Sequence, residues 1–396
     1  MKPLSAWLTL AAGLALAGPG LAQNWEVSGA ITGELRYFTE SPAFPGQTTD
    51  RLQGSLSFEA RGVYSWNGGT DQIVVAPFLR WGEASGGRNH FDLREAYWLR
   101  QGDGWSLTAG VDKVFWGVTE SRNPVDIVNQ DDLREDIGGG AKLGQPMINL
   151  NLYGEWGTLE LYVLPWFRPR QFPDFGARLA GPAPIGAPAY TDPDGRRNVD
   201  YALRWSRSIG EWDLGLSYFR GTSREPVLVP AGPTLVPRYD QISQAGLDVQ
   251  FTAGDWLWKL EAIDRTGQGP RFQAVTAGFE WSLYGIGGSG ADLGLIAEWN
   301  YDNRDKAQAP ATPYDNDLFL GARLSLNDIG STSLLAGALI DRRTDARVFM
   351  IEGQRRLGED WLLEVTGRFM EGGTFPDPIA AVQSDDYLSV SMRYSF

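Results

Sequence analysis

The last residues of the chain, 385–396, read DDYLSVSMRYSF. From Tyr387 onward polar and apolar side chains alternate, and the apolar row runs from Leu388 to Phe396. A period of two places successive side chains on opposite faces of an extended strand. Because chain termini are usually polar and frayed, an amphipathic strand that ends on an aromatic ring needs a surface for its apolar row. The nature of that surface decides the fold.

The same alternation recurs from Trp25 onward. The stretch WEVSGAITGELRYF places Ile31 and Leu35 on one face and Glu34 and Arg36 on the other. About eighteen such stretches follow one another, and short turns rich in Gly, Asp and Asn alternate with longer connections rich in Pro, Gly and Asp. The longer connections lie near 39–51, 117–145, 168–196, 221–238, 302–316 and 371–385.

This pattern predicts an all-β fold, a transmembrane antiparallel up-and-down β-barrel of about 18 strands, with 16 as the alternative. A soluble sandwich or propeller would show the same alternation, but the two loop lengths and an export signal favour the barrel. The row from Leu388 to Phe396 would then face lipid, and the last strand would pair with the first, because no strand edge stays unpaired in hydrocarbon. Pro77 and Pro165, which fall inside predicted strands, indicate bulges there.

The first 22 residues have the composition of a secretory signal peptide. Lys2 precedes an apolar run that ends before Gly18, and small residues at Gly20 and Ala22 predict cleavage after Ala22. An uncleaved anchor helix is the weaker alternative, because Gly18, Pro19 and Gly20 interrupt the run. Residues 23–396 are then a single transmembrane β-barrel domain, in which no apolar run reaches the ~18 residues of a membrane helix.

The composition excludes several classes of function. A formal net charge of −14 argues against nucleic acid as a partner. With no Cys and only His90, neither a Cys–His pair nor a two-His metal site can form, so we expect no enzyme, no cofactor and no metal. His90 as the base of a lipase-like site is less favoured than a residue at the barrel rim. Asp192, Asp194 and Asn198 start like a calcium loop but lack its bidentate Glu, so turn chemistry is the commoner explanation.

The C-terminal strand that ends on Phe396 resembles the signature of bacterial outer-membrane β-barrels. The resemblance implies the Gram-negative outer membrane as the location, with outer-membrane lipid and lipopolysaccharide as neighbours. It also implies that Phe396 is the assembly signal that the barrel-assembly machinery recognises.

A long acidic segment lies between the fifth and sixth predicted strands and reads FWGVTESRNPVDIVNQDDLREDIGGGAKLGQPMINL. It resembles the loop of general diffusion porins that folds into the barrel and narrows it, although those porins commonly have sixteen strands. The resemblance implies a pore constriction loop that carries Asp126, Asp131, Asp132, Glu135 and Asp136.

The wall facing this loop follows from strand parity. An Arg on the lipid face at mid-depth would cost about 2–4 kcal/mol, so arginines in the first two and last two strands are assigned to the lumen. The predicted lumen basic wall is Arg36, Arg61, Arg368 and Arg393. An acidic loop opposite this wall would set a transverse field that orients solutes and filters ions by charge. The alternative is that these arginines only pair with inward glutamates such as Glu34, Glu59 and Glu364.

The leading hypothesis is an outer-membrane porin-like channel for passive or facilitated diffusion of small hydrophilic or ionic solutes. The alternatives are a substrate-specific exporter or importer of anionic saccharides or other organic solutes, which resembles the polysaccharide-export barrels, and a structural outer-membrane protein without transport. A TonB-dependent transporter or a fatty-acid channel would carry an N-terminal plug or hatch, and here the barrel is predicted to begin a few residues after Ala22. A homo-oligomer is compatible with the sequence, which shows no interface.

Overall fold

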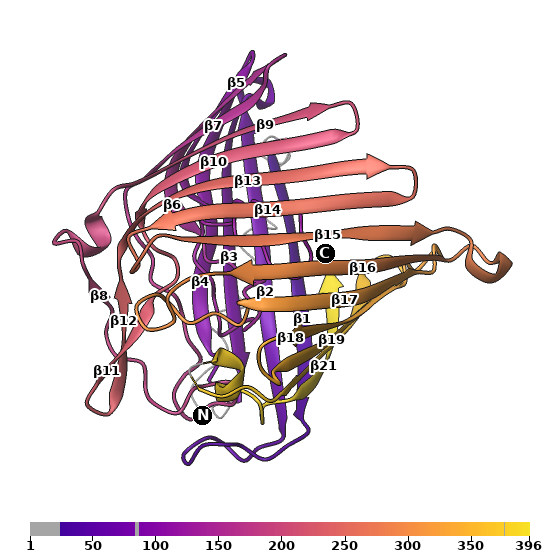
Figure 1. The fold of residues 1–396 in the computed structure, drawn as a ribbon. Helices are drawn as coiled ribbons and strands as arrows, with labels where there is room; N and C mark the ends of the chain where they lie inside the picture. Colours follow the sequence, from indigo (N-terminus) through magenta and orange to yellow (C-terminus); the bar gives the residue numbers. More distant parts are fainter. Residues whose placement is uncertain (1–23, 84–86, 376) are drawn as a thin grey trace, which may run out of the picture.

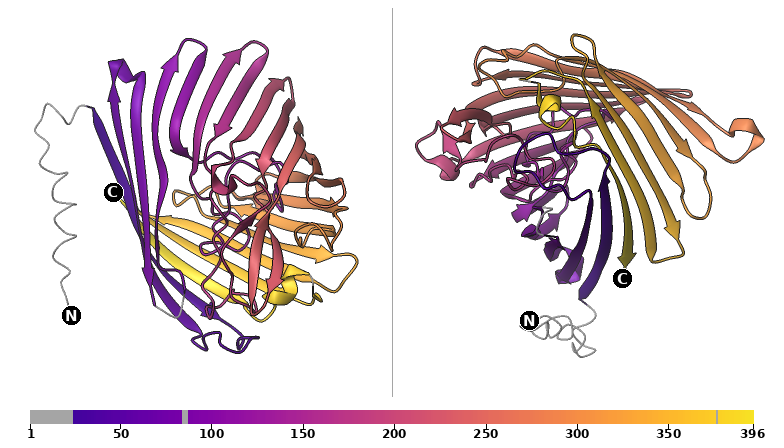
Figure 2. Two further views of the ribbon diagram at one scale, coloured as in Figure 1. Left: turned by 90° about the vertical axis from the view of Figure 1, so that its left-hand side faces the viewer. Right: turned by 90° about the horizontal axis from the view of Figure 1, so that it is seen from below.

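A computed structural model describes residues 24–83, 87–375 and 377–396 of the chain, so the predicted signal peptide at 1–22 lies outside the described residues. Eighteen strands form one antiparallel sheet in which each strand pairs with its neighbours along the chain. Figures 1 and 2 show this sheet curving round on itself to form a barrel with a segment folded inside. The prediction of an 18-stranded barrel is confirmed.

The barrel strands, with the labels of Figure 1, are β1 (Trp25–Phe38), β2 (Leu52–Trp66), β3 (Asp71–Gly82), β4 (His90–Gly102), β5 (Trp105–Asp112), β6 (Gln145–Gly154), β7 (Gly157–Leu164), β9 (Asp200–Ile209), β10 (Trp212–Thr222), β13 (Gln241–Ala253), β14 (Trp256–Thr266), β15 (Phe272–Leu283), β16 (Asp292–Asp302), β17 (Asn316–Ser325), β18 (Ser333–Asp341), β19 (Arg347–Leu357), β20 (Trp361–Glu371) and β21 (Tyr387–Ser395). A second, separate sheet contains β11 (Val227–Ala231), β12 (Thr234–Tyr239) and β8 (Ala189–Tyr190).

The barrel closes where the first and last strands meet. β1 and β21 pair antiparallel from Ala30 opposite Ser395 to Phe38 opposite Tyr387. Beyond the end of β21, Phe396 exchanges two backbone hydrogen bonds with Gly29, of 2.9 and 3.0 Å. Its ring lies where a β-carbon on Gly29 would fall, 2.6 Å from Cζ, so only glycine at this position lets the ring cover the seam. The predicted closure is confirmed.

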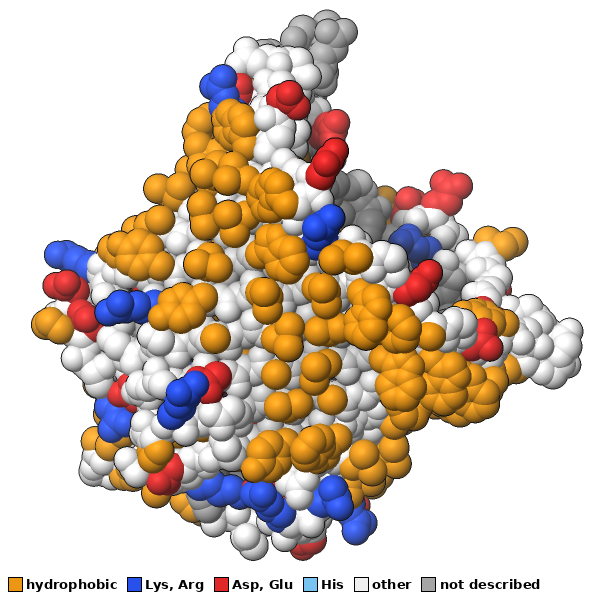
Figure 3. Space-filling model, turned by 45° about the horizontal axis from the view of Figure 1, so that its top comes forward, with side chains coloured by type: hydrophobic (Ala, Val, Ile, Leu, Met, Phe, Trp, Pro, Cys, Tyr) orange, Lys and Arg blue, Asp and Glu red, His pale blue; other side chains and the backbone are white. Residues whose placement is uncertain are grey.

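The outer face of the wall is apolar. Outward positions on successive strands carry exposed large apolar side chains, among them Leu35, Phe58, Leu216, Leu320 and Val390. Figure 3 shows such side chains as a broad area across several strands, bordered by charged residues. Because exposed apolar patches of this size are rare on soluble monomers, this face fits a hydrocarbon surrounding.

The two ends of the barrel differ in the length of their connections. Turns such as those at 103–104, 155–156, 210–211 and 254–255 lie at the end where β1 begins, and the long connections lie at the other end. By analogy with barrels of this type we call the two ends periplasmic and extracellular. Short 3-10 helices occur at Asn67–Gly69, Gly195–Arg197, Ile286–Gly288 and Pro378–Ala381. In the part of the chain that the structure describes, no helix is long and apolar enough to cross a membrane.

One of the two proline predictions is confirmed and the other is wrong. The register between β3 and β4 shifts between Ala76 and Pro77, because Pro77 has no N–H to donate to the ladder. Arg94 of β4 is therefore left without an opposite residue on β3. Pro165 instead lies just after β7, which ends at Leu164, so the missing donor terminates the strand rather than bending it.

Candidate pore and constriction loop

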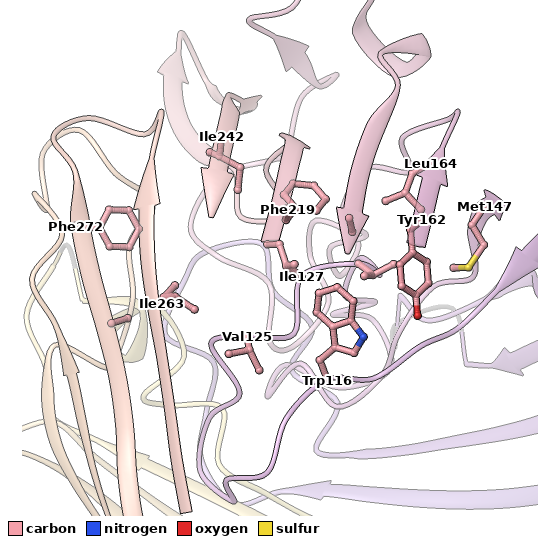
Figure 4. Close-up of a cluster of buried hydrophobic side chains, with 13 residues drawn as sticks. Trp116, Val125, Ile127, Met147, Tyr162, Leu164, Phe219, Ile242, Ile263 and Phe272 are labelled. Carbon is pink, nitrogen blue, oxygen red and sulfur yellow. The ribbon is translucent and has the colours of Figure 1, made fainter. Parts of the chain in front are cut away.

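The connection from β5 to β6, residues 113–144, lies inside the barrel, and we call it the inner loop. Its side chains Trp116, Val125, Ile127 and Val128 are buried in one cluster with inward side chains of the wall. The wall members include Met147, Tyr162, Leu164, Phe219, Ile242, Ile263 and Phe272 (Figure 4). Since apolar side chains of the loop and of the wall contact each other, the inner loop packs directly against part of the wall.

Two buried carboxylates of the wall hold the first part of the inner loop. Glu261 of β14 accepts the N–H groups of Val118 (2.7 Å) and Thr119 (2.9 Å), and also the amide of Asn123 (2.9 Å). Glu298 of β16 accepts the N–H groups of Glu120 (2.7 Å) and Ser121 (2.8 Å). A buried charge is tolerated only with such complete hydrogen bonding, so each carboxylate fixes the backbone that it binds.

The next acidic residues of the inner loop are paired with bases. Lys142 lies 3.0 Å from Asp126 and 2.7 Å from Asp131, and Arg170 lies 2.6 Å from Asp131. Burial alone would lower the pKa of Lys142, but the carboxylates of Asp126 and Asp131 raise this pKa above its ordinary value. Asp126 and Asp131 are therefore occupied by partners on the inner loop and on the connection after β7.

The tip of the inner loop reaches the opposite wall. Glu135 forms a bidentate pair with Arg80 of β3, at 2.7 and 2.8 Å, and Asp132 pairs with Arg134 at 2.9 Å. His90 lies under this tip, with Nε2 at 3.5 Å from Asp132. Asp136 binds the N–H groups of Gly138 and Gly140, at 2.9 and 3.0 Å, and so closes the glycine turn. The inner loop thus spans the lumen from β14–β16 to β3.

The lumen is divided into two halves by this arrangement. The inner loop covers the inward face of β6, β7, β9, β10 and β13–β16, which we call the sealed half. The open half consists of β17–β21 and β1–β4, whose inward side chains include partly exposed charged residues such as Arg61 and Glu352. β5, which leads into the inner loop, lies between the two halves.

The four arginines predicted as a basic wall all lie in the open half, and each has a carboxylate partner. Arg36 lies 3.2 Å from Glu34, Arg61 lies 3.2 Å from Glu95, and Arg393 lies 3.5 Å from Glu59. Arg368 pairs with Glu352. The four stand at different heights in the wall, because Arg36 is opposite Gln53, whereas Arg393 is opposite Thr32 and Arg61 is opposite Ser28.

A denser basic group lies near the extracellular end of β1, β3 and β4. Glu34 is within 3.2 Å of Arg36, Arg80 and Arg88 together. Arg80 also binds Glu135, so three guanidinium groups share two carboxylates. We call Arg36, Arg80 and Arg88, with Glu34 and Glu135, the arginine cluster. Nε of Arg36 is buried without a partner among the described residues.

An acidic cavity lies deeper in the open half. It measures about 250 Å³, and its lining contains Glu120 of the inner loop and inward residues of β17–β20. The charged lining residues are Glu120, Arg323, Glu352 and Glu364. The lining thus contains three carboxylates and one guanidinium group; Arg323 lies 2.6 Å from Glu120, and Glu352 pairs with Arg368 outside the lining.

The structure therefore brings Glu135 to the basic side, while it places Asp126 and Asp131 on other partners. Arg80, Arg88, Glu261 and Glu298 were missed from the sequence. Arg80, Glu261 and Glu298 stand at inward parity among apolar neighbours, in LRWG, KLEAI and IAEWN, which is a readable signal for a lumen contact. The candidate calcium residues are used locally: Asp192 accepts the N–H of Asp194 at 2.9 Å. Among the described residues no group of three or more His, Asp or Glu could hold a metal ion.

Comparison with known proteins identifies the fold. No family model matches the chain, and no curated protein matches its sequence. Among solved structures, OccK3 (OpdO) of Pseudomonas aeruginosa superimposes with a TM-score of 0.56 at 11% identity, covering 94% of this chain and 96% of that one. OccK2 (OpdF) of the same organism, solved in complex with glucuronate, gives 0.53 at 12% identity, covering 94% and 98%. The chain has the fold of the porins of the Gram-negative outer membrane.

Proposed function

We propose that this protein is a porin-like channel of the outer membrane through which small hydrophilic solutes diffuse. The apolar outer face would contact membrane lipid and lipopolysaccharide, and Phe396 would present the assembly signal. The inner loop would act as the constriction, with Glu135 and Asp136 as the acidic residues nearest the route and Arg36, Arg61, Arg368 and Arg393 on the wall beside it.

The division of the lumen carries this proposal. The inner loop fills the sealed half with apolar contacts, whereas the open half keeps inward Arg and Glu side chains that are partly exposed. An 18-stranded barrel is too wide for the side chains of its wall to fill, so a polar and partly exposed lining favours a water-filled space over a packed core. A channel needs an aqueous route that is narrow and lined by charge.

A second candidate is a channel with a preference for organic anions such as uronates. The arginine cluster favours it, because Arg36, Arg80 and Arg88 share Glu34 and Glu135 and keep an excess of positive charge. OccK2, which shares the fold, was solved with glucuronate, a sugar acid. The acidic cavity below the cluster favours the general channel instead, since it would oppose an anion that has passed the cluster.

The test is reconstitution of the purified protein in planar bilayers and in liposomes. We expect single-channel conductance, and liposome swelling with neutral monosaccharides. If swelling with glucuronate exceeds that with glucose, the anion-preferring alternative holds, and equal rates support the general channel. Absence of conductance and of swelling from a barrel that keeps its heat-modifiable mobility on gels would disprove both candidates.

A further inference from the structure

A segment of the extracellular connection from β7 to β9 crosses the mouth of the barrel. Residues 172–186, which we call the strap, read FPDFGARLAGPAPIG and are rich in Gly, Pro and Ala. At one end the backbone of Gln171 is bonded to Leu133 of the inner loop (2.9 Å), and at the other Gly186 is bonded to Leu235 of β12 (2.8 Å). Between these ends the strap reaches the loops 39–51 and 372–386, which connect β1 to β2 and β20 to β21.

The centre of the strap is held by a buried ion pair. Arg178 and Asp385 are each 2% exposed, and Nε of Arg178 lies 2.5 Å from Oδ1 of Asp385. Arg178 also donates to the carbonyl oxygens of Ser384 (2.5 Å) and Glu40 (3.1 Å), and its guanidinium lies 4.4 Å from the ring of Phe38. All of these partners lie on the two loops or at the end of β1. We call Arg178 and Asp385 the catch.

Neighbouring residues strengthen the same contact. The other oxygen of Asp385 accepts the N–H of Leu179 (2.9 Å), Gln47 donates to the carbonyl of Ala180 (3.0 Å), and Thr48 donates its N–H to the carbonyl of Gly176 (2.7 Å). Leu179 has φ of +65°, a left-handed conformation that costs a leucine free energy and persists only where its surroundings impose it. The docked strap is therefore a strained conformation that specific partners maintain.

The docking site lies over the open half of the lumen. Leu179 packs with Phe38, Met370 and Tyr387, which lie at the extracellular ends of β1, β20 and β21. Ile137 from the tip of the inner loop packs against the same cluster. The strap thus covers the space between the inner loop and the open wall, where solutes would enter.

We propose that the strap is a lid over the extracellular mouth, that the catch holds it shut, and that release of the catch opens the pore. This inference rests on the proposed channel function for its effect on transport, but the docking of the strap can be measured without transport. Two physical facts support a lid that can move. The strap consists largely of residues without long side chains, and its docked form combines local strain with one concentrated group of contacts.

The chain has no Cys, so a single introduced thiol reports on the strap alone. We would place it at Ala180, which is 4% exposed, and measure the rate of maleimide labelling in the refolded barrel. Breaking a buried ion pair by removing one partner shifts an equilibrium by about 100-fold or more, so Asp385→Asn and Arg178→Gln should each speed labelling by at least about 100-fold. Arg178→Lys keeps the charge but loses the fork and should fall between. Ala177→Cys, at another buried strap position, is the second reporter.

The matched control is Arg343→Gln, which removes a half-exposed extracellular arginine that pairs with Asp315 and does not touch the strap. It should leave labelling and conductance unchanged. In bilayers the catch variants should open to a higher conductance level more often than the parent. If both catch variants are labelled at the parent rate while their heat-modifiable mobility is intact, the proposal that the catch holds a lid shut is wrong. Faster labelling in a protein that never conducts would uphold the catch and reject the channel function instead.

Discussion

The sealed and open halves of the lumen use the same inward strand positions for different purposes. In the sealed half Glu261 is 0% exposed and accepts hydrogen bonds from the backbone and side chains of the inner loop. In the open half the side chain of Glu352 is 47% exposed and pairs with Arg368. Parity alone assigns both residues to the lumen. The difference between the two residues comes from the inner loop, which packs against the inward face of the sealed half and leaves the inward face of the open half exposed.

This contrast predicts that the largest effect comes from Glu261→Ala. The substitution leaves several buried N–H groups of the inner loop without an acceptor, at a cost of about 3–5 kcal/mol. We expect the inner loop to detach, with a lower free energy of unfolding in detergent and a larger single-channel conductance. Glu352→Gln in the open half is the control, and its unfolding free energy should stay within about 0.5 kcal/mol of the parent. Equal losses in the two variants would remove the distinction between the halves.

A second test addresses the apolar contact of the sealed half. Ile263→Ala removes a buried side chain that lies in the cluster with Val125 and Ile127, and it should cost about 2–5 kcal/mol through lost transfer and a cavity. Thr366→Ala, at an inward position of the open half, should change stability by less than about 0.5 kcal/mol. Urea titration of both variants in the same detergent gives the comparison. An Ile263→Ala barrel with the same unfolding free energy as the parent would mean that the packing of the inner loop against the wall does not stabilise the protein.

A third test uses pH on an ion group at the border of the sealed half. Glu225, on the connection after β10, contacts Arg265 and lies 3.4 Å from Arg304. Burial would raise its pKa, but Arg304 and Arg265 hold the pKa of Glu225 well below its ordinary value. A depressed carboxyl pKa contributes stability that is complete above the unfolded value near ~4.3 and is lost as pH falls through the folded value.

The parent should therefore exceed Glu225→Gln in unfolding free energy by about 1–3 kcal/mol at pH 7, and the difference should persist down to about pH 5 and shrink below it. Denaturant titrations of the two proteins across this range measure it. If the difference in unfolding free energy instead grows as the pH falls, the ion pairs of Glu225 with Arg265 and Arg304 do not stabilise the folded protein.

The smallest expected effect is electrostatic and belongs to the open half. Arg61→Gln removes a guanidinium whose side chain is 47% exposed in the lumen. Stability should change little, but the reversal potential in a salt gradient should move toward cation selectivity. The shift should be larger near 0.1 M than near 1 M salt, because the screening length falls from about 10 to about 3 Å. An unchanged reversal potential at both concentrations would show that Arg61 only pairs with Glu95.

The sequence was sufficient for the barrel and only partly sufficient for its interior. Alternation of side chains predicts the inward arginines and the strand number, because each strand obeys the same local rule at positions such as Glu34 and Arg36. The partners of the loop acids could not be read in the same way, since Asp131 meets Arg170 and Glu135 meets Arg80 only after distant segments fold together.

The bulge at Pro77 shows where the local rule stops. A proline inside a strand is visible in the sequence, and the missing donor predicts that the ladder is interrupted there. Which residue of the facing strand stays unpaired depends on how β3 and β4 pack. In the structure that residue is Arg94, so the register on either side of it, including the pairing of Glu95 with Ala76, could be assigned only from the folded sheet.

The seam at Gly29 and Phe396 has a consequence for how the barrel forms. Most strands pair with a neighbour that is close along the chain, whereas β1 and β21 are separated by all the other strands of the barrel. Such a contact of high sequence separation is slow to form and completes the ladder late. A barrel stalled before that event would display two unpaired edges, so the pairing of β1 with β21 removes the last edges at which two chains could aggregate.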